Sequence, residues 1–163
     1  MKFYFKLRSF MPLIIIIMVI VALTIVKAAY TGLWMGPSMM IDFMAWWLLI
    51  FGGFKLIKLS VFAEAYGMYD IIAMRVRAYG FIYPFIEIAL GLMFLFRFEI
   101  NIALWTTLIL MIINSIGAYR GIRDNKVLQC ACLGTVFKLP MSYVSLGEDL
   151  LMAVMALIII LGL

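Results

Sequence analysis

The sequence predicts an all-α integral membrane protein, for two reasons. Of its 163 residues, 68% are apolar and 13% are charged, and the mean hydropathy is +1.21. A soluble domain is usually about 45–50% apolar and about 25% charged, so this chain cannot cover itself with polar surface. Its apolar stretches also lack the alternation of a membrane barrel, whereas a helix satisfies its own backbone in lipid. The expected partner is therefore the lipid bilayer, and a nucleic-acid binder, a disordered chain and a large soluble domain are excluded.

Five apolar stretches are long enough to cross a bilayer, which takes about 20 helical residues. Within one transmembrane domain covering 1–163, we expect spans at about 10–26, 39–54, 79–96, 101–119 and 148–163. The first stretch also has features of a secretory signal, because basic residues precede it and a small-residue step follows; we expect it to be retained as a span. The less apolar stretch at about 60–78 repeats apolar residues at three- and four-residue steps, which predicts an amphipathic helix along the membrane interface.

The basic residues are concentrated on one side of the predicted membrane spans. Eleven of the thirteen Lys and Arg precede the first span or lie between spans two and three or four and five, which leaves Lys27 and Arg97 for the other side. The positive-inside rule then predicts a cytoplasmic N-terminus and an external C-terminus, most simply in a bacterial inner membrane. The net charge of +5 is thus a topology signal and not a nucleic-acid patch. The chain has no His, so its chemistry must come from Cys, Met, Lys, Tyr or carboxylates.

The two cysteines, Cys130 and Cys132, lie in the run QCACLGTVFKLP between spans four and five. Gly134 and Pro140 mark this run as an irregular turn, where a thiol is not core packing. A C-x-C pair is a redox dithiol, a thiolate clamp for a soft metal, or two inert small residues. A disulfide across one intervening residue is cramped and easily reduced, which suits an exchange site better than a structural crosslink.

Glu87 lies about eight residues inside the third span, where a carboxylate costs about 2.5–3.5 kcal/mol on insertion scales. It should therefore face the bundle interior, on the same helical face as Tyr83. Lys55, at the end of the antiparallel second span, is its expected partner. Two interpretations stay open: an ion pair that fixes helix register, or a group that handles protons or substrate.

Further candidate ligands are Asn114, in the fourth span, and Asp149, which opens the fifth and could reach the Cys run. On the external side, Met35, Met39 and Met40 bring thioethers together, and thioethers bind Cu(I). With the two cysteines they define an alternative site for Cu(I) or Hg(II). Methionine is also a common filler of apolar helices, and that interpretation is the stronger one for these three.

From the second span onward the chain resembles the MauE/DoxX family of small redox-associated membrane proteins. The resemblance is carried by FGGFKLIKLSVFAEAYG at 51–67, YPFIEIALGL at 83–92, CACLG at 130–134 and the acidic pair at 148–149. It implies a four-helix bundle of spans two to five, with the first span at its edge, and a role in thiol redox state beside thioredoxin-fold partners. Carried over residue by residue, Cys130 and Cys132 would be the redox pair and Glu87 the intramembrane acid.

Two other classes of function remain open. The charge pattern puts the cysteines on the cytoplasmic side, where thiols are kept reduced. That placement favours a soft-metal carrier that receives copper or mercury through Met ligands and passes it from the Cys pair to a metallochaperone. The third class is a non-catalytic membrane subunit. No motif for hydrolysis, phosphoryl transfer or nucleotide binding is present, so an enzymatic role would be limited to thiol chemistry.

Overall fold

The computed structural model describes residues 2–123 and 141–162, and within these ranges the chain is helical with connecting turns and no strand. The fold class predicted from composition is confirmed. The helices are α1 (Lys2–Thr31), α2 (Gly36–Ile57), α3 (Leu59–Tyr66), α4 (Arg77–Leu95), α5 (Ile100–Arg123) and α6 (Met141–Leu161).

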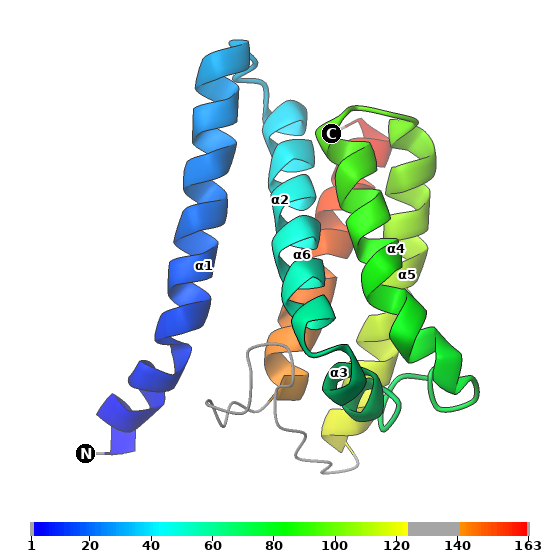
Figure 1. Cartoon of the computed structure of the whole chain (residues 1–163). Helices are drawn as coiled ribbons and strands as arrows, with labels where there is room; N and C mark the ends of the chain where they lie inside the picture. The colour runs from blue at the N-terminus through cyan, green and yellow to red at the C-terminus, as the bar shows by residue number, and fades with distance from the viewer. Residues whose placement is uncertain (1, 124–140, 163) are drawn as a thin grey trace.

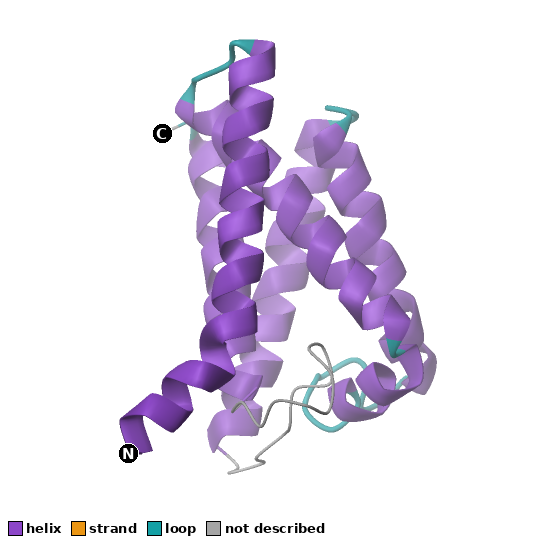
Figure 2. Cartoon of the chain, turned by 60° about the vertical axis from the view of Figure 1, so that its left-hand side comes forward, coloured by secondary structure: helices purple, strands orange, loops and turns teal. Residues whose placement is uncertain are grey.

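Four helices contain stretches long and apolar enough to cross a membrane, namely Leu13–Thr31, Gly36–Ile57, Arg77–Leu95 and Ile100–Arg123. The 21-residue α6 runs antiparallel to α5 and packs along it, so it has the length for a fifth crossing. The long helices alternate in direction, and the short α3 crosses one end of the bundle (Figure 1), called here the α3 end. The α1–α2 and α4–α5 connections lie at the opposite end, as does the C-terminus, whereas the N-terminus lies toward the α3 end (Figure 2).

The helices extend past the predicted spans. α2 begins at Gly36, with a proline in its first turn, and α5 continues to Arg123 with two arginines in its last turn. Proline is favoured at a helix start because its missing N–H has no helical partner there, and cations near a helix C-terminus complement the dipole. Hydropathy marks the apolar stretch of each helix, whereas the helix itself continues beyond that stretch.

The helix in the region of the predicted stretch of 60–78 is shorter than expected. α3 ends at Tyr66, and the chain then turns until α4 begins at Arg77. The Asp70 carboxylate accepts hydrogen bonds from the backbone N–H groups of Ile72 and Ala73, at 3.0 and 2.8 Å. An aspartate side chain that binds the backbone two and three residues on competes with helix formation, and this is why the periodic apolar pattern does not continue as a helix.

Glycines allow close packing of the helices. A Cβ added at Gly91 in α4 would lie 2.9 Å from the Leu49 side chain of α2, and one at Gly80 would lie 3.2 Å from the Ala63 backbone of α3. Small residues let membrane helices approach until their backbones nearly touch, which is a main source of helix association in lipid. These contacts hold α2 and α3 against α4.

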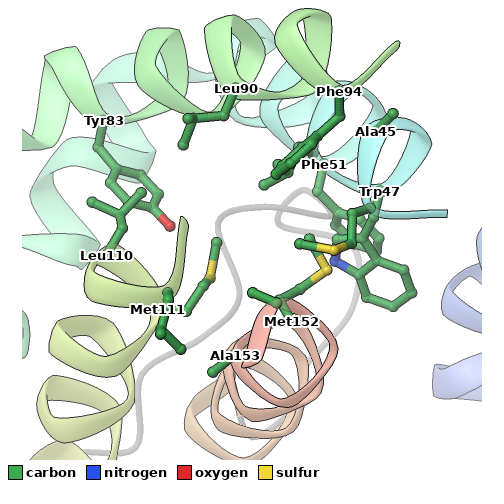
Figure 3. Close-up of a cluster of buried hydrophobic side chains, with 14 of the residues drawn as sticks. Ala45, Trp47, Phe51, Tyr83, Leu90, Phe94, Leu110, Met111, Met152 and Ala153 are labelled. Carbon is green, nitrogen blue, oxygen red and sulfur yellow. The ribbon is translucent and has the colours of Figure 1, made fainter. Parts of the chain in front are cut away.

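The core lies between α2, α4, α5 and α6, whereas α1 packs along α2 at the edge. Its side chains converge from four helices (Figure 3) and include Ala45, Trp47, Phe51, Tyr83, Leu90, Phe94, Leu110, Met111, Met152 and Ala153. The bundle with an edge helix agrees with the arrangement expected for spans two to five and the first span.

A charged cluster links α1 to the bundle at the end opposite α3. Asp42, which is 1% exposed, binds Lys27 of α1 and Arg97 of the α4–α5 connection, both at 2.8 Å. Lys27 also donates to the Leu95 carbonyl at 3.1 Å, and Arg97 to the Ser38 carbonyl at 3.1 Å. The two basic residues that the charge pattern assigned to one side thus meet on a single carboxylate.

Candidate functional site

A second polar cluster is buried inside the bundle toward the α3 end. The Lys55 ammonium donates to both carboxylate oxygens of Glu87, at 2.6 and 2.8 Å. The side chains of Lys55 and Glu87 are 11% and 4% exposed. The predicted ion pair between spans two and three is therefore present, and Glu87 faces the bundle interior.

A hydrogen-bonded chain of neutral groups lies beside this ion pair. The Tyr66 hydroxyl donates to Oδ1 of Asn114 at 2.7 Å, and Nδ2 of Asn114 donates to the Tyr83 hydroxyl at 2.5 Å. All three side chains are buried, and the Tyr83 hydroxyl lies close enough to Glu87 to interact with it electrostatically. Asn114 of α5 thus joins α3 to α4, the helix that carries Glu87.

Aromatic rings surround the lysine. The Lys55 ammonium lies 4.9 Å from the ring centroid of Tyr83 and 5.4 Å from that of Phe62, which are distances typical of cation–π contacts. Tyr66 stacks between these rings, with its centroid 5.1 Å from that of Phe62 and 4.8 Å from that of Tyr83. Burial, assisted by the charge of Asp70, raises the pKa of the Tyr66 hydroxyl well above its ordinary value, so this hydroxyl acts as a donor.

Asp149 of α6 and Asp70 of the turn after α3 complete the cluster. Both are buried, and Asp149 interacts electrostatically with Lys55, Glu87 and Asp70. One carboxylate oxygen of each aspartate, Oδ2, has no hydrogen-bond partner within the described ranges. The site therefore holds more acidic groups than its single lysine neutralises.

The structure brings together most of the predicted site residues. Those that meet at the α3 end are Lys55, Tyr83, Glu87, Asn114 and Asp149. Cys130 and Cys132 lie outside the described residues. The methionine group is at the other end of α2, where Met35 precedes the helix and is 66% exposed.

Tyr66 and Asp70 were not among the site residues predicted from the sequence. Tyr66 could have been predicted from its place among the apolar residues of the 60–78 stretch. A tyrosine that is buried usually forms a hydrogen bond through its hydroxyl group, so a polar partner would have been expected. In the described part of the chain, no group of three or more His, Cys, Asp and Glu side chains is placed to hold a metal ion. The hydrogen bonds of this arrangement join α2 to α4, α3 to α5 and α5 to α4, and its buried carboxylates are groups that can bind protons.

A family model described as "Methylamine utilisation protein MauE" matches residues 11–162. No curated protein and no solved structure matches the chain. The match begins at the start of the first apolar stretch and covers almost the whole chain, including the Lys55–Glu87 pair and the Cys130–Cys132 run. On this evidence the chain belongs to the MauE family of membrane proteins.

Proposed function

We propose that the protein carries out thiol–disulfide exchange through Cys130 and Cys132, as its resemblance to the wider MauE/DoxX group implies. The supporting observation is where the segment that carries the pair is attached. α5 ends at Arg123 and α6 begins at Met141, both at the α3 end of the bundle. The described residues on either side of the cysteine run, Arg123 and Met141, therefore lie at the end of the bundle that holds the Lys55–Glu87 site.

The exchange is balanced without an added oxidant. The thiolate of one cysteine attacks a disulfide sulfur of a thioredoxin-fold partner, forms a mixed disulfide and expels one partner thiolate. The second cysteine then attacks its neighbour's sulfur, closes the C-x-C disulfide and releases the partner as a dithiol. Two electrons pass from this chain's pair to the partner, and the reverse sequence oxidises the partner. Lys126 and Lys138 flank the pair in sequence and favour the reactive thiolate.

A trapping experiment tests this proposal. With Cys130→Ser or Cys132→Ser, the remaining thiol cannot resolve a mixed disulfide, so one of the two variants should accumulate a covalent adduct with a thioredoxin-fold protein that reducing agent releases. The matched control is the double variant, which should give no adduct. If neither single variant gives an adduct in cells, thiol exchange is refuted.

We also propose the orientation given by the charge pattern, with the N-terminus and the cysteine segment in the cytoplasm of a bacterial cell and the C-terminus outside. A membrane-impermeant maleimide should label Cys130 only after the membrane is opened. A reporter fused after Leu163 should be active in the external compartment. Labelling in intact cells would place the pair on the oxidising side and reverse the orientation.

Soft-metal transport is the second candidate, and one observation favours it. Met35 is exposed at the start of α2, and Met39 lies one turn later, with its N–H bonded to the Met35 carbonyl at 3.1 Å. The Met group, which includes Met40, would receive Cu(I) or Hg(II) as cargo, and the Cys pair would pass it to a metallochaperone. Stoichiometric metal that is lost with Cys130→Ser and Met35→Leu alike would support transport, and a protein with neither metal nor adduct would be a non-catalytic subunit.

A further inference from the structure

Two buried carboxylates share one lysine in this bundle. Glu87 of α4 and Asp149 of α6 are 3% and 7% exposed. The Lys55 ammonium donates to both carboxylate oxygens of Glu87, and both nitrogen–oxygen distances are below 3 Å. Asp149 is near enough to interact with both members of this pair, but its Oδ2 atom has no hydrogen-bond partner among residues 2–123 and 141–162.

The other groups that face Asp149 do not supply a second positive charge. Asp149 interacts electrostatically with Asp70 of the turn after α3 and with the hydroxyl groups of Tyr66 of α3 and Tyr83 of α4. Asn114 of α5 is already bonded to both tyrosines. Within the described structure, the basic group that interacts with Asp149 is Lys55 alone, and the remaining neighbours are neutral or acidic.

An ionised carboxylate buried without its own cation is strongly disfavoured, and a second carboxylate nearby disfavours it further. When two acids compete for one cation in a low-dielectric site, the better-placed acid ionises and the other keeps its proton. The bidentate contact identifies Glu87 as the better-placed acid. A protonated carboxyl at Asp149 removes the excess negative charge without moving any helix.

We propose that Glu87, Asp149 and Lys55 form a proton-binding site in which Glu87 is the ionised partner of Lys55 and Asp149 holds an exchangeable proton at neutral pH. The proton and the lysine are linked: when Lys55 turns from Glu87 to Asp149, the proton passes to Glu87. The site thus has two states of equal net charge, and it does not depend on thiol chemistry at the cysteines.

Infrared spectroscopy of the reconstituted protein tests this directly, because a protonated carboxyl group has a carbonyl stretch separate from that of a carboxylate. The protein should carry Cys130→Ser and Cys132→Ser, so that the result is independent of the proposed exchange. At neutral pH we expect one buried carboxyl band that shifts in heavy water and disappears at alkaline pH. Labelling the aspartate side-chain carboxyls with carbon-13 should shift this band, and this measurement needs no variant at the site.

Variants at the three residues should change the band at neutral pH in different directions. Asp149→Asn should abolish the band because it removes the protonated carboxyl. Glu87→Gln should abolish it too, because Lys55 can then pair with Asp149 and Asp149 ionises. Lys55→Met should roughly double the band, since both acids lose their cation. Asp70→Asn is the matched control and should retain the band, because the Asp70 carboxylate is already bonded to two backbone N–H groups. Absence of the band, its failure to shift with labelled aspartate, or its persistence in Asp149→Asn would overturn the proposal.

Discussion

Replacing Lys55 by methionine gives the sharpest test of what holds the bundle together. The Lys55 and Glu87 side chains are only 11% and 4% exposed, so water screens their contact weakly. Removing one partner of a buried pair costs about 3–5 kcal/mol, because the remaining acid must either stay buried as an uncompensated charge or be neutralised by taking up a proton. Loss of the cation–π contacts with Phe62 and Tyr83 contributes to the same change. We therefore expect Lys55→Met to lower the free energy of unfolding by about 3–5 kcal/mol.

The matched control is Lys58→Met, because Lys58 is exposed at the end of the same helix and should change stability by about 0.5 kcal/mol or less. Glu87→Gln should cost less than Lys55→Met, since the amide keeps hydrogen-bonding capacity and Asp149 remains near the lysine. The double variant Lys55→Met, Glu87→Leu should recover most of the loss, because an apolar pair leaves no buried charge.

Equilibrium unfolding in mixed micelles with increasing dodecyl sulfate measures these differences, and the four tryptophans supply the fluorescence signal. We expect strong coupling between Lys55 and Glu87 in a double-mutant cycle. A cost of Lys55→Met no greater than that of Lys58→Met, or a double variant that loses the sum of the two single effects, would refute a stabilising buried ion pair.

Three further predictions use the same unfolding measurement. Gly91→Ala should cost about 1–3 kcal/mol because its new methyl group would enter α2, whereas Gly53→Ala, with nothing within 4 Å, should be neutral or slightly stabilising; equal effects would contradict the close-packing argument. Asp42→Asn should cost about 2–4 kcal/mol by leaving two cations with a neutral partner, and an unchanged stability would show that the cluster at that end contributes nothing. Asn114→Leu should cost about 1–3 kcal/mol by breaking the link between the two tyrosines, with the exposed Asn101→Leu as control; similar losses at both positions would remove the basis for that link.

The parts of the structure that follow from one-dimensional rules could be predicted from sequence. Hydropathy located the long helices, and the cost of a carboxylate in lipid required Glu87 to face inward. Its pairing with Lys55 followed from antiparallel neighbours, because the end of one span meets the start of the next. These inferences need only the bilayer, the helix period and the direction of the chain.

The remaining parts depend on contacts between segments distant in sequence. α3 ends early because the Asp70 side chain binds the backbone, which competes with the periodic pattern. Asn114 could be assigned to the bundle interior, but its partners depend on how α3 folds back under α4. Asp42 binds both Lys27 and Arg97, which requires three separate segments of the chain to come together. The residue spacing within any one segment does not predict this contact.

The cluster at Asp42 has a consequence for how the chain enters the membrane during synthesis. Lys27 and Asp42 are 15 residues apart and lie on two consecutive helices, whereas Arg97 follows Asp42 by 55 residues. An isolated second helix would carry a buried anion into lipid, but α1 and α2 inserted together as a hairpin offer the translocon an ion pair that offsets this charge. Arg97 then joins only after α4 has been made. Because Lys27 precedes Asp42 in the chain and Arg97 follows it, the order of synthesis allows this contact to form in two steps.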